Sequence, residues 1–332
     1  MTAPLVSSVV RKLFDIIKEL KAKGKTIIFI SHRLEEVLII CDKIIVLKDG
    51  NLEGIVDSSS KETLPLLRKT IIRMMTGTEK GLSFPEKTGL KLKGETVLSV
   101  KNIKNKYLKN ISLEIHKGEI VALAGLRGQG QSSLLRTIAG LLFKEDGDIH
   151  IFGEKLRINN PRKAMDSGIF FVSDRRDEEE LWLTHDVWLN ISVASIGGRA
   201  RFGFIQRKKD KETIQQMVSR LNIDTPSLAK IVSQLSGGNR QKVVLGKYLL
   251  ARPKILLLNQ PTKGLDVGAK VEIYHLLRKL SNEGIPTLAV LTDLAEVVNL
   301  PDRLLVMREG EIVKEFSQER INEEELLDSY YG

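Results

Sequence analysis

Two stretches of the chain repeat one another. The stretch GKTIIFISHRLEEVLIICDKIIVLKDG, residues 24–50, aligns without a gap with GIPTLAVLTDLAEVVNLPDRLLVMREG, residues 284–310. In each, an apolar run, an amphipathic segment and a second apolar run ending in Gly predict a strand, a helix, a strand and a turn. A repeat at a fixed spacing indicates two copies of one structural unit. Seven pairs are identical: Gly24 and Gly284, Leu34 and Leu294, Glu36 and Glu296, Val37 and Val297, Asp42 and Asp302, Val46 and Val306, Gly50 and Gly310.

The same alignment indicates where each copy begins. Carried back, it sets the first residues of the chain opposite Pro261 and Thr262, partway through the unit. We expect residues 1–73 to be the C-terminal remnant of a first copy, 74–94 to be a linker containing Gly, Pro and Lys, and 95–332 to be a second copy. A natural small N-terminal domain is the alternative, but it would lack the strands that its own helix should cover.

The second copy has the element order of an α/β domain. From residue 95 the pattern predicts a strand, a hairpin, a helix and a short strand. A helical stretch follows at about 181–233, after which strands and helices alternate to the end. We therefore expect a mixed sheet with flanking helices, an antiparallel β subdomain and a helical subdomain. Trp182 and Trp188 of the helical stretch serve either a docking surface or the core.

Composition narrows the class of protein. With 332 residues, 42% hydrophobic and 28% charged, the chain fits a globular protein of about two domains. One cysteine excludes a disulfide framework, and no apolar run reaches the roughly 18 residues that span a bilayer, so we expect a cytoplasmic protein. The net charge of +10 is spread over helical stretches that also carry acids, and the 5% aromatics do not interleave with basic runs. We therefore expect no nucleic-acid partner.

A glycine-rich turn predicts a phosphate-binding loop. The apolar run EIVALA leads into GLRGQGQS and then into a helical pattern, which is the layout G-x-x-x-x-G-K-[ST]. In this layout backbone N–H groups and the helix N-terminus bind phosphate oxygens. The lysine that would reach the outer phosphates is replaced by Gln131, so a turn without a ligand is an equal alternative on this loop alone. The candidate phosphate-binding residues are Gly125, Gly128, Gly130, Ser132 and Ser133.

Two further motifs lie downstream of this loop. LSGGNRQK, residues 235–242, is a polar turn that opens an amphipathic helix, and ILLLNQPT, residues 255–262, is an apolar strand that runs into a turn. With PTKGLDVGAK and ISHRLEEV, these motifs make the chain resemble an ATP-binding-cassette (ABC) ATPase, of the type found in bacterial importers of ribose, galactose and xylose. The resemblance covers nearly the whole chain and implies a P-loop NTPase fold of ABC type.

The resemblance implies how ATP and Mg²⁺ would be bound. In such proteins two cassettes lie head to tail, and each ATP is held between the phosphate loop of one cassette and the signature turn of the other. Asp174 occupies the place of the loop that links the nucleotide to the transporter. The residues expected to contact nucleotide from the signature turn are Ser236, Gly237 and Gly238, and Gln241 and Asp266 are further candidate nucleotide contacts.

The second copy differs from the family at four catalytic positions. Gln131 supplies no cation, and Asn259 is a neutral group where a carboxylate should hold Mg²⁺ together with Ser132. Gln260 replaces the carboxylate that acts as base. The switch histidine of the first copy, His32, corresponds to Thr292 in the second. Four losses at separate positions predict that this cassette, and the chain alone, do not hydrolyse ATP, and that the cassette binds ATP and Mg²⁺ weakly.

The expected function is that of an ATP-binding subunit, or a fragment of one, from a carbohydrate importer. The resemblance implies permease subunits in the inner membrane as partners, an indirect link to a periplasmic or extracellular sugar-binding protein, and a complete first cassette or second ATPase chain. The expected location is the cytoplasmic face of the plasma membrane. Alternatives are a non-catalytic regulatory cassette and a truncated, non-functional gene product. A cassette of DNA repair or translation is disfavoured, because the chain lacks the long coiled coil or zinc ligands of repair cassettes.

Overall fold

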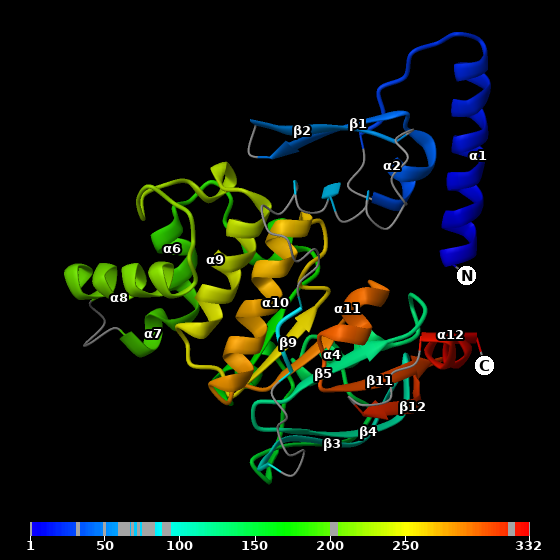
Figure 1. Ribbon diagram of the computed structural model, residues 1–332. Coiled ribbons are helices and arrows are strands. Elements are labelled where there is room, and N and C mark those ends of the chain that lie inside the picture. The colour runs from blue at the N-terminus through cyan, green and yellow to red at the C-terminus, as the bar shows by residue number, and fades with distance from the viewer. Residues whose placement is uncertain are drawn as a thin grey trace. The chain divides into compact units, whose positions relative to one another are not determined.

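The computed structural model divides into two compact units. Unit 1 comprises Met1–Ser83 with Asp266–Val271, and unit 2 comprises Phe84–Leu265 with Glu272–Gly332. Figure 1 labels the elements of both. The predicted linker 74–94 lies largely outside the described residues. The structure describes residues 2–30, 34–48, 51–58, 67, 70–71, 74, 84–87, 94–199, 205–317 and 323–331.

The core of unit 2 is a six-stranded mixed sheet in the order β12-β11-β5-β10-β9-β8. All neighbouring strands pair in parallel except β11 and β12, which are antiparallel. The central strands are continuous apolar runs buried on both faces, as expected for a sheet covered by helices on both sides. The strands are β5 (Ile120–Ala124), β8 (Ile169–Val172), β9 (Ile255–Asn259), β10 (Thr287–Val290), β11 (Arg303–Arg308) and β12 (Glu311–Ser317).

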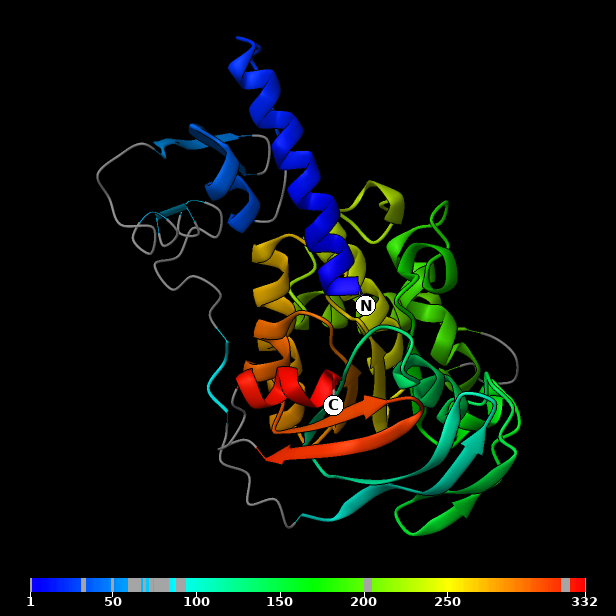
Figure 2. The same cartoon turned by 90° about the vertical axis from the view of Figure 1, so that its right-hand side faces the viewer.

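A second, antiparallel sheet has the order β4-β3-β6-β7. Its apolar face packs with the six-stranded sheet and helix α4 in one core, which includes Leu98, Leu134 and Leu257. Figure 2 shows this sheet in cyan and green. The bounds are β3 (Thr96–Asn105), β4 (Leu108–His116), β6 (Asp146–Ile151) and β7 (Glu154–Leu156).

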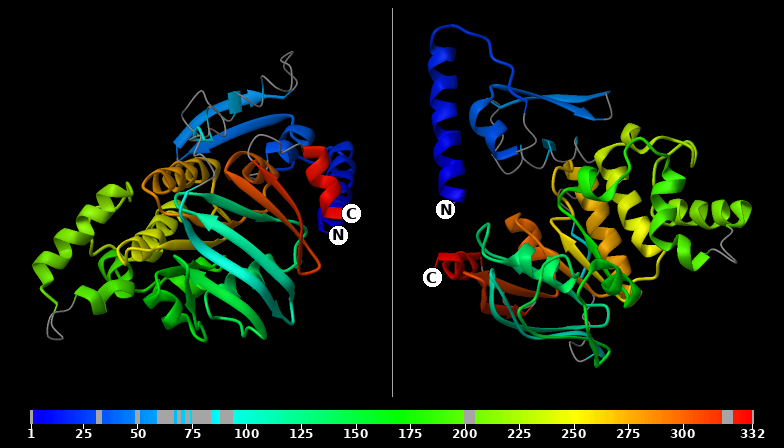
Figure 3. Two further views of the ribbon diagram at one scale, coloured as in Figure 1. Left: turned by 90° about the horizontal axis from the view of Figure 1, so that it is seen from below. Right: turned by 180° about the vertical axis from the view of Figure 1, so that it is seen from behind.

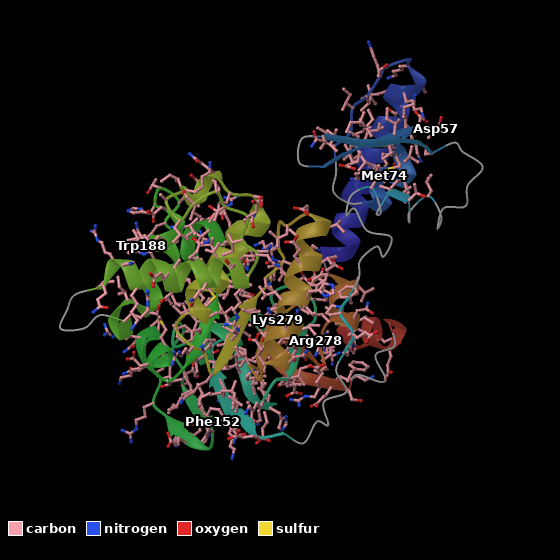
Figure 4. The ribbon with its side chains drawn as sticks, turned by 60° about the vertical axis from the view of Figure 1, so that its left-hand side comes forward. Asp57, Met74, Phe152, Trp188, Arg278 and Lys279 are labelled. Carbon is pink, nitrogen blue, oxygen red and sulfur yellow. The ribbon has the colours of Figure 1, made fainter. Side chains whose placement is uncertain are left out.

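Helices complete unit 2. A buried ion pair, Arg278 Nη1 to Asp302 Oδ1 at 2.7 Å, ties α10 to the start of β11, and Asp302 Oδ2 accepts from the Ile120 N–H at 2.8 Å. Figure 4 labels Arg278 on its helix. These helices are α4 (Gln131–Ile138), α5 (Pro161–Asp166), α10 (Val267–Asn282), of which the part from Glu272 onward belongs to unit 2, α11 (Leu294–Asn299) and α12 (Glu323–Tyr331).

The stretch predicted to be helical, 181–233, contains short helices that gather on one side of unit 2 (Figure 3). Trp188 Nε1 donates to Asp210 Oδ2 at 2.7 Å and so joins α6 to α8, whereas Trp182 is 51% exposed. One tryptophan therefore packs and the other faces outward. The helices of this stretch are α6 (Val187–Ser192), η2 (Val193–Ser195), α7 (Ile196–Arg199), α8 (Arg207–Arg220) and η3 (Val232–Gln234); η1, a π-helix (Arg176–Glu180), precedes it and α9 (Gly237–Leu249) follows it.

Unit 1 contains α1 (Thr2–Ala22), α2 (Leu34–Ile40) and the antiparallel pair β1 (Lys43–Lys48) and β2 (Asn51–Asp57). The register of β1 and β2 shifts between Val46 and Leu47. The register of β11 and β12 shifts at the equivalent position of the repeat, between Val306 and Met307. A small core of Ile44, Val46, Val56, Leu67 and Ile71 covers one face of the β1–β2 pair. In the described part of the chain, no helix is both long and apolar enough to cross a membrane.

The prediction of a strand at the start of the first copy is wrong. Residues 25–30 form no strand, although their counterparts in the repeat include β10. In unit 2, β10 receives its hydrogen bonds from β5 and β9. The described residues of unit 1 include no strand equivalent to either. An apolar run without a neighbouring strand has no ladder to join, so its β pattern alone does not make it a strand.

Candidate nucleotide site

The predicted phosphate loop connects β5 to α4. Gly125, Gly128 and Gly130 have positive φ angles of 137°, 86° and 107°. At Gly125 a Cβ would lie 2.3 Å from the Met307 carbonyl oxygen, so only glycine fits. The loop is held on its outer side because the Gly310 N–H donates to the Gln129 carbonyl at 3.0 Å. No side chain caps α4, and its first N–H groups remain available for an anion.

Gln131 and the residues after it begin α4. The Gln131 side chain is only 6% exposed, and its Nε2 donates to the Leu126 carbonyl at 3.2 Å. It therefore closes the loop with a neutral hydrogen bond and brings no charge to a ligand. Ser133, also predicted to contact phosphate, lies in the first turn, and its carbonyl accepts from the Thr137 hydroxyl at 2.7 Å.

Asn259 ends β9 and joins two other predicted site residues. Its side chain is 1% exposed. The Ser132 hydroxyl donates to Asn259 Oδ1 at 2.9 Å, and Asn259 Nδ2 donates to Asp174 Oδ1 at 2.9 Å. The hydrogen-bond partners fix which end of the amide faces each neighbour. Ser132, Asn259 and Asp174 thus form one continuous chain of hydrogen bonds, which runs from a hydroxyl through an amide to a carboxylate.

Lys263 extends this chain and was missed by the sequence analysis. Its Nζ lies 2.8 Å from Asp174 Oδ2, with the lysine 48% exposed and the aspartate 19% exposed. The backbone before Lys263 is fixed, because the hydroxyl of Thr262 donates to both oxygens of buried Glu296 at 2.8 Å. The signal available in the sequence was a lysine placed four residues after the strand end. We call Ser132, Asn259, Asp174 and Lys263 the polar chain.

The other degenerate positions flank the polar chain. Gln260 has a φ of 49°, in the left-handed region, and its N–H donates to the Val290 carbonyl at 3.0 Å. Thr292 lies just after β10 and is exposed. His32 lies outside the described residues. A carboxamide and a hydroxyl have no basic group at neutral pH, so neither Gln260 nor Thr292 can take a proton from water.

The segment after β8 links the loop helix to the helical region. Ser173 Oγ donates to Glu179 at 2.7 Å, and this hydrogen bond is the main reason that the pKa of Glu179 lies below its ordinary value. Buried Glu180 accepts from Lys247 at 2.7 Å and from the Tyr248 hydroxyl at 2.6 Å. Burial, followed by the charge of Glu180, raises the pKa of Tyr248.

The signature turn forms the N-terminus of α9. Ser236 is exposed and caps the helix by accepting from the Asn239 backbone N–H at 3.3 Å; it also accepts from the Asn239 side chain at 3.0 Å. The Gly237 carbonyl accepts from Arg176 at 3.0 Å, and Gly238 is buried. Gln241 is 3% exposed, and its Nε2 has no hydrogen-bond partner among the described residues. The turn therefore presents a hydroxyl and helix N–H groups outward, as an anion contact requires.

Asp266 belongs to unit 1, and Tyr107 and Tyr330 belong to unit 2. Asp266, predicted to contact nucleotide, caps α10 by accepting from the Ala269 N–H at 2.9 Å. Tyr107, in the turn between β3 and β4, is 51% exposed and free to stack on a ring. Tyr330 of α12 was missed by the sequence analysis: burial raises its pKa to about 12, opposed by a hydrogen bond from the Gly125 backbone. The last helix thus reaches the first glycine of the loop.

Residues 108–263, which include the loop, the polar chain and the signature turn, match the family model described as ABC transporter. The chain has the fold of an ABC ATPase. An ATP-binding cassette of an ABC transporter in its ADP conformation aligns with a TM-score of 0.59 at 21% identity, over 71% of this chain and 99% of that one. The cbiO1 cassette from Clostridium perfringens gives 0.59 at 23% identity, over 71% and 93%. The predicted fold class is confirmed.

The ABC domain and the rest of the chain also match curated proteins. The ribose import ATP-binding protein RbsA of Caldanaerobacter subterraneus is 38% identical over 328 residues, which are 98% of this chain and 65% of that protein. A putative ribose/galactose/methyl galactoside import ATP-binding protein of Halalkalibacterium halodurans is 39% identical over 98% of this chain and 61% of its own length. The chain thus spans somewhat less than two thirds of these relatives.

Proposed function

We propose that the chain is part of the ATP-binding component of a bacterial sugar importer, and that the site on its ABC domain binds nucleotide without hydrolysing it. The importer assignment rests on relatives named for the import of ribose or galactosides. The binding assignment rests on the phosphate loop, whose glycines and uncapped helix start are retained. The lack of hydrolysis rests on the polar chain.

One observation carries the loss of hydrolysis. The end of β9 presents two amides, Asn259 and Gln260, and the buried one has both ends of its side chain engaged by Ser132 and Asp174. Neither amide can accept a proton from water, and the carboxylate that meets this strand end, Asp174, is paired with Lys263. The described residues also contain no cluster of three or more His, Cys, Asp or Glu side chains that could hold a metal. The donor set does not fit the Mg²⁺ that accompanies ATP in this family.

The proposed partners are permease subunits at the cytoplasmic face of the plasma membrane, with a separate sugar-binding protein as an indirect partner. A second cassette would complete each nucleotide site, because Ser236 at the start of α9 is exposed and its hydroxyl accepts hydrogen bonds from Asn239 rather than from the phosphate loop. A regulatory cassette that binds nucleotide without driving transport is the second candidate. The retained signature turn supports both, since each needs head-to-tail contact.

A bare apolar face on unit 1 supports a cassette partner there as well. Ile45 and Leu47 of β1 are 59% and 69% exposed, whereas their counterparts in the repeat, Leu305 and Met307, are 1% and 0% exposed. In unit 2 those counterparts lie on β11, which pairs in parallel with β5. We propose that a cassette segment equivalent to residues 95–260 covers this face of unit 1 and supplies the missing neighbouring strand.

This contact is tested with the portion of the Caldanaerobacter relative that the chain does not match. We expect it to form a one-to-one complex with the chain in sedimentation, and Ile45→Glu to abolish the complex. Ile39→Glu is the matched control, because Ile39 is equally exposed but corresponds to polar Asn299. A complex that survives Ile45→Glu would show that the face is not the contact.

Nucleotide binding and turnover are tested on the purified chain. We expect ATP to bind and no phosphate to be released above the level of Gly128→Glu, which places a carboxylate in the loop. Gly153→Glu is the control, because Gly153 also has a positive φ and open space around it but lies in the turn between β6 and β7. If the wild type and Gly153→Glu release phosphate and Gly128→Glu does not, the site is an active ATPase and the proposal is wrong.

A further inference from the structure

The polar chain links the ammonium group of Lys263, through Asp174 and Asn259, to Ser132 at the start of α4. Of its four members only Asp174 and Lys263 carry charge, and they pair at 2.8 Å. Arg136, on α4, is already engaged by Glu179 at 3.1 Å. The loop itself contributes the neutral amide of Gln131 and the exposed guanidinium of Arg127, which is not part of the polar chain. Within the described part of the site, Lys263 is therefore the ammonium group closest in the hydrogen-bond chain to the Ser132 hydroxyl.

The same arrangement opposes a divalent metal ion. Mg²⁺ requires oxygen ligands with free lone pairs in near-octahedral geometry. Here Asp174 Oδ1 accepts from Asn259, Asp174 Oδ2 accepts from Lys263, and Asn259 Oδ1 accepts from Ser132. Each oxygen faces a hydrogen-bond donor, and one of these donors is itself a cation that repels Mg²⁺. The site thus holds the single positive charge of Lys263 where members of the family hold Mg²⁺.

We propose that this site takes a nucleotide phosphate chain in its metal-free form, with Lys263 as the cation that contacts the phosphates. This inference rests on the proposed binding of nucleotide at the phosphate loop. The backbone of Lys263 is held by the turn, since its N–H donates to the Gln260 carbonyl at 3.1 Å and the adjacent Thr262 is anchored to Glu296. The side chain is half exposed, so its ammonium can leave Asp174 for a ligand while the backbone stays in place.

The ammonium group of Lys263 should bind a phosphate chain in preference to Asp174. A half-exposed lysine–aspartate pair contributes little to stability, so breaking it is easy. A phosphate chain offers more negative charge and more acceptor oxygens than one carboxylate, and charge-assisted hydrogen bonds to it are strong. Asp174 competes with the ligand for the same ammonium. Removing the aspartate charge should therefore tighten metal-free binding, whereas removing the lysine charge should weaken it.

The test is calorimetry of ATP binding to the full chain, first with a chelator and then with excess Mg²⁺. We expect wild type to bind ATP at least as tightly with the chelator as with Mg²⁺. Lys263→Met should weaken metal-free binding by roughly tenfold or more, the range of a hydrogen bond to a charged group. Asp174→Asn, which keeps the shape of the side chain, should tighten it severalfold.

The chain offers a matched control pair. Lys155 and Asp148 also form an exposed ion pair at 2.7 Å, but on the antiparallel sheet. Lys155→Met and Asp148→Asn change the net charge equally and should leave ATP binding unchanged. Tighter binding with Mg²⁺ by tenfold, together with unchanged metal-free binding in Lys263→Met, would overturn this inference and leave the proposed function intact. No binding in either condition, with wild type equal to Gly128→Glu, would overturn both.

Discussion

The substitution Asn259→Asp tests the polar chain most sharply, because it changes one nitrogen to oxygen in a side chain that is 1% exposed. The new carboxylate loses the hydrogen bond to Asp174 Oδ1, which is 2.9 Å from Asn259 Nδ2, and faces that oxygen with like charge. Two unit charges about 4 Å apart repel by about 4 kcal/mol at an effective dielectric constant near 20. Ser132 and Lys263 offset part of this, so we expect a loss of about 2–4 kcal/mol at pH 7.5 without metal.

The assay is thermal unfolding with and without Mg²⁺. A loss of that size corresponds to a fall of roughly 6–12 °C in Tm for a domain of this size. The repulsion raises the pKa of the pair, so the loss should be full above the raised pKa and should shrink as pH falls toward 4. Mg²⁺ should restore much of the stability of the variant, because two adjacent carboxylates bind it, and should not stabilise the wild type.

Asn190→Asp is the control for burying a carboxylate elsewhere. Asn190 is 2% exposed, and its Nδ2 donates to backbone carbonyls, including that of Asp186 at 2.9 Å. This variant should also be destabilised, but Mg²⁺ should not rescue it. Equal stability of Asn259→Asp and wild type without metal, or equal response of both to Mg²⁺, would refute the reasoning about the polar chain.

Three other predictions concern the end of β9, the phosphate loop and the segment after β8. The double variant Asn259→Asp with Gln260→Glu should still release no phosphate in a steady-state assay, because Gln131 and Thr292 are unchanged; restored turnover would contradict this. Gly125→Ala should lower stability by roughly 2–4 kcal/mol in urea, since its Cβ meets the Met307 carbonyl at 2.3 Å, whereas open Gly153→Ala should cost less. The pKa of Glu179 is lowered from 4.5, so the small stability deficit of Glu179→Gln, under about 1 kcal/mol, should be present at pH 7 and vanish as pH falls below 4.5; a constant deficit would contradict it.

Local patterns in the sequence predicted the parts of the site that form locally. The run EIVALA, the glycines of the loop and the start of a helix lie consecutively in the chain, and the structure has β5, the loop and α4 in that order. The signature turn likewise opens α9, with Ser236 as its cap. In both cases the backbone conformation depends on glycine freedom and capping, which a sequence displays directly.

Contacts between residues far apart in the chain could not be predicted from local sequence patterns. Asn259 and Asp174 are 85 positions apart, and Lys263 and Asp174 are 89 apart, so no local pattern could pair them. From the sequence alone, Asn259 is therefore interpreted as a lost ligand, and Lys263 is not recognised as part of the site. The error at residues 25–30 has a related cause: the apolar pattern is that of a strand, but a strand forms only where another strand supplies its hydrogen bonds.

The proposed function requires that the ABC domain bind ATP and leave it intact. The most direct measurement is the identity of the nucleotide that stays bound. The full chain is incubated with labelled ATP and Mg²⁺ for many hours, passed through a desalting column and denatured, and the released nucleotide is separated by chromatography, with Gly128→Glu as the control for carry-over. We predict that wild type releases unchanged ATP above the control level. Release of bound ADP in proportion to the protein, absent from Gly128→Glu, would contradict the claim.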